Sequence, residues 1–259
     1  MMRAAVLFLA LLLSASPAMA WGPRGHQAIA HLAAMNLTPQ ARAQVASLLS
    51  GDAEAMMVMS ANWADEIRDT RPQTGPWHYV NLKISGDLRY RAARDCPRDA
   101  CVVAQIARQE AVLRGSAPRA QKAEALKYLI HLIADIHQPL HAADNNDRGG
   151  NSVFLRGGGQ RITLHHFWDD DMVVASGRDP RAIARALDAA IPRGRKDTLG
   201  AGTPMAWAQR SATIARDHIY PQAHRVPSQK EASDYARIAR EQMTRGGYAL
   251  AARLNTIFR

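Results

Sequence analysis

This sequence of 259 residues lacks the features that would place it in a membrane or divide it into several domains. Beyond its first twenty residues, no stretch approaches the ~20 apolar residues that a membrane-spanning helix requires. It has no internal repeat, no low-complexity block and no evident linker. We therefore expect one domain over residues 21–259, with enough chain to bury one substantial core.

Cysteine is also scarce, since Cys96 and Cys101 are the only two in the chain. In an oxidising compartment we expect them to join and close a short loop around Pro97 and Asp99. Such a bridge is a local staple, and we expect no catalytic part for either cysteine.

The first twenty residues carry one charge, on Arg3, contain a run of Ala, Val, Leu and Phe, and end in Ala18-Met-Ala20. This pattern predicts a secretory signal peptide, residues 1–20, that is cleaved before Trp21. The alternative is an uncleaved membrane anchor, but the apolar core is short for spanning a bilayer. We therefore expect a periplasmic or secreted protein. Loss of Arg3 lowers its formal net charge by one from +10, and a basic exported protein suits a polyanionic partner such as nucleic acid or a phospholipid surface.

The segment from Leu126 to His141 has the pattern of a buried helix, because apolar residues cover nearly every side of its first part. His131 and Asp135 interrupt this pattern four residues apart, so they lie on a single stripe of the helix. No Lys or Arg lies between Tyr128 and His141 to neutralise the carboxylate, and an unpaired buried carboxylate is unfavourable. A metal ion would satisfy both residues, as would an internal His–Asp hydrogen bond, and the pair alone does not decide between them.

The rest of the chain is mainly helical in pattern. We expect helices at 28–35, 39–49, 60–68, 100–115, 118–136, 166–175, 180–190, 204–218 and 230–257. A short extended segment is expected at 77–83, and a small β-hairpin at 153–156 and 161–164 around Gly157-Gly-Gly159. The predicted fold class is therefore a mainly α, single-domain, multi-helix fold with a small β-hairpin.

Further histidines and aspartates lie in local contexts that are often buried, beside aromatic residues or within apolar runs. These candidates are His26, Asp65, His78, His141, His165 and Asp169. The pair His165 and Asp169 repeats the spacing of His131 and Asp135, which makes a second His-x-x-x-Asp face available. A lone buried histidine is usually structural, so only the accumulation of these residues favours a metal site.

Seven motifs follow one another between residues 21 and 169. They are Trp21-Gly-x-x-Gly-His26, Trp63-Ala-Asp-Glu-Ile-Arg68, Trp77-His-Tyr-Val-Asn81, His131-Leu-Ile-Ala-Asp135, Gln138-Pro-Leu-His141, Gly149-Gly-Asn151 and His165-His-Phe-Trp-Asp169. On these motifs the chain resembles the zinc-dependent single-strand nuclease family, the P-one/S-one nucleases, whose fold is similar to that of bacterial zinc phospholipase C. Each motif alone is weak, and the combination is specific.

The resemblance implies three zinc ions (Zn²⁺) per chain, held by nine residues. Asp65, His78, His131 and Asp135 would hold the first, Trp21 through its α-amine and carbonyl with His26 and a shared Asp135 the second, and His141, His165 and Asp169 the third. Zinc lowers the pKa of bound water from ~16 toward ~7 and so supplies hydroxide to attack a phosphodiester. Asp65 would orient that water, and Arg68 would stabilise the pentacoordinate phosphate. The alternative for Arg68 is a plain ion pair with Asp65.

The resemblance also implies substrate-binding residues. Tyr79 looks like the aromatic residue that clamps a base, Asn81 like the residue that reads its edge, and Asn151 belongs to a shared motif. Many fungal members carry an acidic residue where Asn81 stands. An amide both donates and accepts, whereas a carboxylate only accepts, so the base preference of those members does not transfer to this chain.

The function that this resemblance implies is an exported zinc-dependent endonuclease. It would cleave single-stranded DNA and RNA to 5′-phosphate products and also remove 3′-phosphate from nucleotides. We expect a monomer with no stable membrane association after signal cleavage. The alternatives are a phospholipase C-like zinc phosphodiesterase and a non-catalytic exported protein that binds zinc or nucleic acid.

Overall fold

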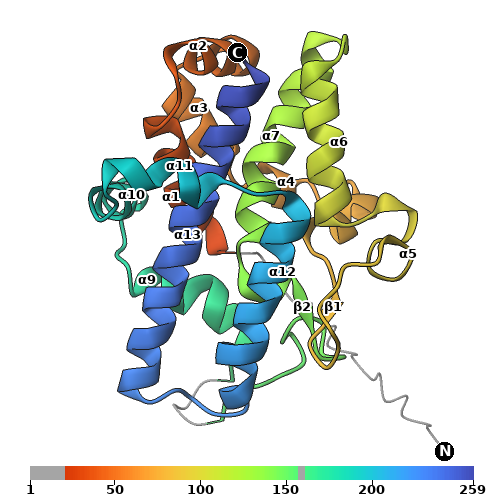
Figure 1. Ribbon diagram of the computed structural model, residues 1–259, viewed down its shortest axis with the longest axis vertical. Coiled ribbons are helices and arrows are strands. Elements are labelled where there is room, and N and C mark those ends of the chain that lie inside the picture. Colours follow the sequence, from red (N-terminus) through yellow and green to blue (C-terminus); the bar gives the residue numbers. More distant parts are fainter. Residues whose placement is uncertain (1–20, 157–160) are drawn as a thin grey trace, which may run out of the picture.

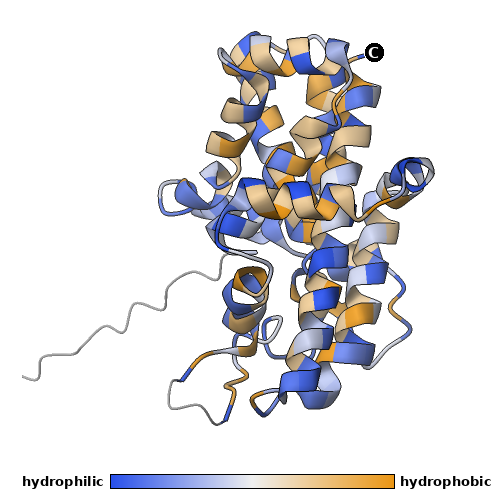
Figure 2. Cartoon of the chain, turned by 90° about the vertical axis from the view of Figure 1, so that its left-hand side faces the viewer, coloured by the Kyte–Doolittle hydropathy of each residue, from blue (hydrophilic) through white to orange (hydrophobic). Residues whose placement is uncertain are grey.

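The computed structural model describes residues 21–156 and 161–259, so the predicted signal peptide and the Gly157-Gly-Gly159 turn lie outside it. Helices make up nearly all of the regular structure (Figure 1), as predicted. Most helices carry both apolar and polar residues (Figure 2), as expected where one face packs on a core. Among the described residues, no helix is both long and apolar enough to cross a membrane.

The centre of the fold is α7 (Arg119–Ile136), the helix predicted at 118–136. Every residue from Tyr128 to Ile136 is buried, which confirms a helix that is enclosed on all sides. It packs against α6 (Val102–Arg114) and α13 (Gln229–Ile257). Burial of each Leu or Ile side chain contributes about 1.5–3 kcal/mol, so this helix is a rigid support for the two polar residues that it carries.

The first helix, α1 (Gly22–Met35), begins six residues before the predicted start at 28 and therefore includes His26. Pro23 is tolerated in its first turn, where no intrahelical donor is needed. A Cβ atom on Gly25 would lie 2.6 Å from the Cβ of Trp21, so only glycine lets the buried Trp21 side chain fold back over this turn. The helix packs against α13 and α10 (Pro180–Ala189).

The helix predicted at 60–68 is interrupted. The structure has α3 (Ala53–Ser60), which was not predicted and is capped by the Asp52 side chain, and then a single turn, α4 (Trp63–Glu66). The interruption turns the carbonyl oxygen of Ala61 toward the Nδ1–H of His131, 2.7 Å away. The break in the helix therefore provides a hydrogen-bond acceptor for a residue of α7.

The extended segment predicted at 77–83 is wrong in its first part. Pro72–His78 form a 3₁₀ helix, η1, because Pro72 and Pro76 hold the backbone in a turn conformation. The strand β1 (Leu82–Lys83) then pairs in parallel with β2 (Ala143–Asp144). Local patterns do not indicate this pairing, because the two strands lie about sixty residues apart in the chain.

The predicted β-hairpin is present as a short antiparallel pairing. Phe154 forms a bridge with Thr163, and the backbone N–H of Leu155 donates to the carbonyl oxygen of Ile162 at 3.0 Å. The turn that would join the two segments lies outside the described residues.

The remaining elements follow the predicted helical pattern, with two π turns that were not expected. The segment predicted at 166–175 is α8 (Leu164–His166), a π turn (Phe167–Asp171) and α9 (Met172–Val174). The segment predicted at 204–218 is α12 (Pro204–Ile214) followed by a π turn (Ala215–Ile219). The other elements are α2 (Pro39–Leu49), α5 (Ala92–Asp95), η2 (Pro97–Asp99), η3 (Pro139–His141), η5 (Arg193–Arg195), α11 (Lys196–Gly200) and η7 (Tyr220–Gln222).

Candidate metal centre

Eight of the nine predicted zinc ligands are histidines and aspartates, and all eight meet in three neighbouring clusters. The clusters are His26, His131 and Asp135; Asp65, His78 and His131; and His141, His165 and Asp169. Within each cluster the possible ligand atoms lie within 4.8 Å of one another. The ligands come from α1, α4, η1, α7, η3, α8 and the π turn that follows it, so segments far apart in the chain converge here.

Asp135 links the first two clusters through its two carboxylate oxygens. Its Oδ1 lies 3.0 Å from Nε2 of His26, while its Oδ2 lies 2.9 Å from Nδ1 of His78 and 3.2 Å from Nε2 of His131. Asp65 also lies beside His78 and His131. The distance from its Oδ1 to Nδ1 of His78 is 3.5 Å. One carboxylate thus faces two separate sets of ligand atoms, which is the geometry of a bridging ligand.

The third cluster is separate from the other two. Nε2 of His141 lies 3.1 Å from Nε2 of His165, and Nε2 of His165 lies 3.4 Å from Oδ2 of Asp169. The other oxygen of Asp169, Oδ1, accepts a hydrogen bond from the side-chain amide of Gln138 at 2.6 Å. The orientation of this carboxylate is therefore held by a residue outside the cluster.

Backbone carbonyl groups determine which nitrogen of four imidazoles faces its cluster. In each case the Nδ1–H donates to a carbonyl oxygen: His26 to Gly22 at 3.1 Å, His131 to Ala61 at 2.7 Å, His141 to His78 at 2.8 Å and His165 to Gly149 at 2.6 Å. A neutral imidazole that donates from Nδ1 carries its lone pair on Nε2. In their neutral forms, all four imidazoles therefore point the lone pair of Nε2 into the clusters.

His78 has the reverse orientation, with Nδ1 toward Asp135 and with a buried Nε2 that has no hydrogen-bond partner among the described residues. Oδ2 of Asp65 is also buried without such a partner. Unpaired buried polar atoms are rare in folded proteins, and at a cluster of this kind an ion is a common explanation.

The donor atoms fit zinc. Tetrahedral zinc with bonds of ~2.0–2.1 Å to imidazole places two ligand nitrogens roughly 3.3 Å apart. The pairs His78–His131 and His141–His165 both have nitrogens 3.1 Å apart. Two nitrogens at this separation share either a proton or a metal ion, and the clusters have the donor types and the spacing of zinc sites.

Burial and charge set the protonation states of these groups. Burial lowers the pKa of His131, but the charges of Asp135 and Asp65 outweigh burial and raise that pKa to about 9, so a metal bound there would displace a proton. Burial lowers the pKa of His141 to about 4 and that of His165 to about 3, so both are neutral at ordinary pH. Burial alone would raise the pKa of Asp135, but His131, His26 and His78 hold it well below its usual range. Burial raises the pKa of Asp169 well above its usual range, and the hydrogen bond from Gln138 opposes this shift. A metal at the third cluster would therefore compete with a proton for Asp169.

Trp21, the ninth predicted ligand, lies at the start of α1, five residues before His26. Its side chain is fully buried, and its indole N–H donates to the carbonyl oxygen of Ala134 at 3.0 Å. Its φ is 50°, a left-handed conformation that turns the chain into the helix. The indole therefore anchors the start of α1 to α7, beside Asp135.

Arg68 lies beside Asp65, as the sequence predicted. Its Nη1 is 3.3 Å from Oδ1 of Asp65, so the i,i+3 ion pair is present, and its side chain is 21% exposed. The ion pair holds a positive charge at the edge of the clusters. This position is compatible with the phosphate-binding role as well as with the plain ion pair.

The predicted substrate-binding residues lie near the clusters in the chain. Tyr79 follows His78 directly and is 38% exposed, although most large apolar and aromatic side chains are buried. Asn81 is also exposed. The side-chain amide of Asn151 donates to the carbonyl oxygen of Arg148 at 2.9 Å, so its nitrogen is used within its own loop.

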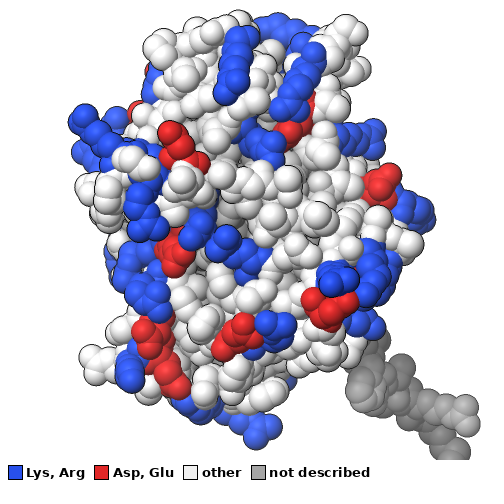
Figure 3. Space-filling model, in the orientation of Figure 1, with Lys and Arg blue, Asp and Glu red and all other residues white. Residues whose placement is uncertain are grey.

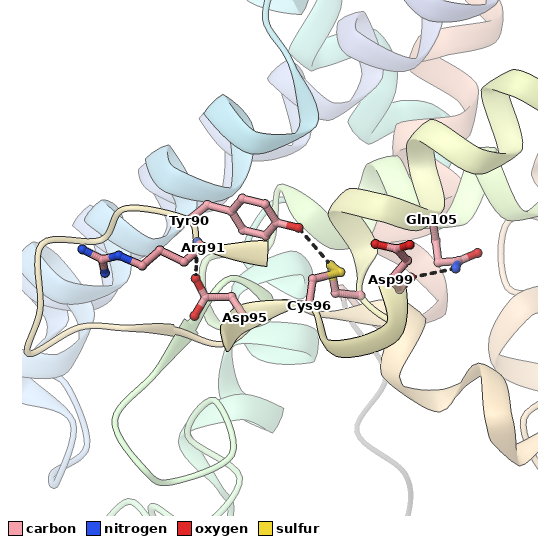
Figure 4. Close-up of a disulfide and its surroundings, with 7 residues drawn as sticks. Tyr90, Arg91, Asp95, Cys96, Asp99 and Gln105 are labelled. Atoms are coloured by element: carbon pink, nitrogen blue, oxygen red, sulfur yellow. Dashed lines mark hydrogen bonds between the residues drawn. A yellow bond between two sulfur atoms is a disulfide. The ribbon is translucent and has the colours of Figure 1, made fainter. Parts of the chain in front are cut away.

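The predicted disulfide between Cys96 and Cys101 is present (Figure 4). The residue after it, Val102, donates its backbone N–H to the carbonyl oxygen of Tyr79 at 3.0 Å. The bridge therefore supports the backbone beside Tyr79 and lies outside the three clusters, in agreement with a structural role.

Gln138 was not predicted to have a function, although it belongs to one of the family motifs. It is fully buried, and its Oε1 accepts from the backbone N–H of Leu140 while its amide group donates to Asp169. The signal available in the sequence was the position of Gln138 between the two predicted ligands Asp135 and His141.

Comparisons with known proteins agree with this geometry. The family described as S1/P1 Nuclease matches residues 21–259. Endonuclease 2 of Arabidopsis thaliana is 27% identical over 92% of this chain and 90% of the relative. Endonuclease 4 of the same plant is 29% identical over 93% of this chain and 90% of the relative. Nuclease S1 of Aspergillus oryzae is 30% identical over 59% of this chain and 54% of that protein.

Proposed function

Because this chain belongs to the S1/P1 nuclease family, we propose that it is an exported, zinc-dependent endonuclease that hydrolyses single-stranded DNA and RNA to 5′-phosphate products. The observation that carries the proposal is Asp135, whose two oxygens face different sets of histidines. Removal of 3′-phosphate from nucleotides would use the same site, because both reactions break a phosphate ester bond.

Three zinc ions would be held by the nine residues Trp21, His26, Asp65, His78, His131, Asp135, His141, His165 and Asp169. Zinc at these positions would supply positive charge for a phosphodiester and would lower the pKa of water to the neutral range. The α-amine of Trp21 becomes a ligand only if the signal peptide has been removed, because an amide nitrogen is a poor ligand.

The residues around the centre would position the substrate. Oδ2 of Asp65, which has no hydrogen-bond partner among the described residues, would accept a proton from the attacking water. Arg68 would hold a phosphate oxygen through its guanidinium group. Tyr79 would stack on a base, and Asn81 would bond its edge, which requires a base that is not already paired in a duplex. Asn151 would contact the substrate through its amide oxygen.

Export to the periplasm or the medium is supported by the leader pattern at residues 1–20 and by the disulfide, since such bridges persist in oxidising compartments. We propose a monomeric enzyme domain over residues 21–259.

The test uses the correctly processed chain that begins at Trp21. Its zinc content is measured by plasma mass spectrometry, and release of acid-soluble nucleotides is compared for denatured and duplex DNA. We expect three zinc ions per chain and faster release from denatured DNA. Phosphocholine release from lecithin without nucleotide release would replace the proposal with a phospholipase, and zinc binding without any turnover would favour a non-catalytic protein.

A variant pair refines this test. We expect Asp65→Asn to fold normally and to lose most of its hydrolytic activity, because the neutral amide cannot accept the proton of water. Asp69→Asn, an exposed carboxylate four residues later that belongs to none of the clusters, is the matched control and should hydrolyse DNA normally. Near-normal turnover of Asp65→Asn would remove Asp65 from the reaction.

A further inference from the structure

A strand that reaches past the scissile phosphate needs cations outside the metal centre, and the overall charge does not show where they lie. The chain carries a formal net charge of +10. Lys and Arg side chains are spread over the face drawn in Figure 3, and Asp and Glu side chains lie among them. Only local contacts around the three clusters therefore distinguish one cation from another.

The helix α7 carries two layers of contacts that lie one turn apart. In the ligand layer, Oδ2 of Asp65 lies 3.5 Å from Nε2 of His131. In the layer one turn earlier, the rings of Trp63 and Tyr128 meet edge to face, with their centroids 5.1 Å apart. The short helix α4 carries both Trp63 and Asp65 and lies against α7 (Figure 1). Trp63 is therefore an immediate neighbour of the candidate metal centre.

Lys127 lies one turn before His131 on α7, on the same stripe of the helix. Its Nζ lies 5.0 Å from the centroid of the Trp63 ring, and this cation–π contact holds the ammonium group in one region. The side chain is partly exposed, so a ligand can reach it from solvent.

The carboxylate closest to Lys127 along the helix face is Glu124, three residues earlier. Its Oε1 is bound by Nη1 of Arg71 at 2.7 Å, and among the described residues Glu124 forms no ion pair with Lys127. The guanidinium group of Arg71 also lies 5.9 Å from the centroid of the Trp63 ring. The charge of Arg71 is thus balanced by Glu124, whereas the charge of Lys127 remains available to an anion.

We propose that Lys127 binds a phosphate of the single strand next to the scissile phosphate, and that Trp63 positions its ammonium group for this contact. The four residues from Lys127 to His131 correspond to a rise of ~6 Å along α7, which is short enough for one strand to meet both layers. A lysine contacts phosphate as a point charge and reads no base, so the contact serves any sequence. This inference rests on the proposed function, because it needs a strand at the metal centre.

The first test measures binding of a labelled single-stranded oligothymidylate by fluorescence anisotropy over a range of NaCl concentrations. All proteins are loaded with zinc and carry Asp65→Asn, which slows cleavage of the strand. We expect Lys127→Met to weaken binding about tenfold at low salt. The slope of the logarithm of affinity against the logarithm of salt concentration should become shallower by about 0.7, the value for one phosphate contact on a single strand. Lys127→Arg keeps the positive charge and should keep the slope.

The second test uses the chain with Asp65 intact and measures steady-state hydrolysis of the same oligonucleotide. Lys127→Met should raise KM about tenfold and leave kcat unchanged, because the contact lies away from the reacting phosphate and is equal in the ground and transition states. A variant that had lost zinc or stability would have a lower kcat instead.

Lys122→Met is the matched control, because Lys122 is a partly exposed lysine of the same helix. Its position lies roughly 140° around the helix axis from that of Lys127, so it should keep the affinity and the salt dependence of the parent protein. The inference is wrong if Lys127→Met keeps the parent slope, or if Lys122→Met loses as much of it. Binding that depends on Lys127 without any hydrolysis by the wild-type chain would contradict the proposed function and leave this contact standing. Hydrolysis with an unaltered slope in Lys127→Met would do the reverse.

Discussion

Replacement of Gln138 by leucine tests whether a residue outside the clusters controls binding at the proposed third zinc site. Gln138 is fully buried, and its amide nitrogen lies 2.6 Å from Oδ1 of Asp169. A hydrogen bond to a charged group contributes about 1.5–3 kcal/mol, and loss of such a bond to a metal ligand lowers metal affinity about 10- to 100-fold. We therefore expect Gln138→Leu to retain two zinc ions and to bind the third about 10- to 100-fold more weakly.

Gln138→Leu also leaves the backbone N–H of Leu140 without its acceptor, which would lower the free energy of unfolding by about 1–3 kcal/mol. Two variants separate this loss of stability from the loss of metal. Gln138→Glu keeps an acceptor for Leu140 but sets a second buried carboxylate against Oδ1 of Asp169 in place of the donor, so its zinc affinity should change while the hydrogen bond of Leu140 stays. Gln105→Leu removes a buried amide that donates to the carbonyl oxygen of Asp99 at 2.9 Å and that belongs to none of the clusters, and it should keep all three ions.

The measurement is a zinc titration against a competing chelator, with stoichiometry from plasma mass spectrometry and stability from urea unfolding. Wild-type affinity for all three ions in Gln138→Leu, together with reduced stability, would show that Gln138 serves the fold alone. Equal zinc loss in Gln105→Leu would attribute the effect to general destabilisation.

Three further predictions concern the start of the chain and its stability. One extra residue before Trp21 should remove one zinc ion and most activity, because the α-amine becomes an amide; three ions measured in the extended protein would contradict this role. Gly25→Ala should lower the free energy of unfolding by about 1–3 kcal/mol, since its Cβ would lie 2.6 Å from that of Trp21. A variant that unfolds at the same urea concentration as wild type would refute the clash. Burial raises the pKa of Asp188, but hydrogen bonds from Lys196, Asn36 and Tyr248 lower it below its usual value. The stability that this carboxylate contributes is therefore present above a pH of ~3.9 and is lost as the pH falls through the lowered pKa. Asp188→Asn should be less stable than wild type at pH 7 and equally stable in strong acid. A difference in stability that does not change with pH would exclude this linkage.

The sequence was sufficient for the helical fold class, for α7 and for the types of residue at the candidate metal centre. The apolar pattern around His131 and Asp135 predicted a buried helix, because a helix that is apolar on every side can only be stable inside a core. The bridge between Cys96 and Cys101 was predicted because they are the only two cysteines of a chain expected in an oxidising compartment. These features depend on residues near each other in the chain, where periodicity and chain reach determine the outcome.

The tertiary structure decided how these residues act together. The sequence left open whether Asp135 pairs with one histidine or serves two sets of ligand atoms, and only the convergence of α1, η1 and α7 places His26 on one of its oxygens and His78 on the other. Likewise, the carbonyl of Ala61 that orients His131 is available because a predicted helix is interrupted. Contacts between distant segments depend on the three-dimensional packing of whole elements, and no local pattern records that packing.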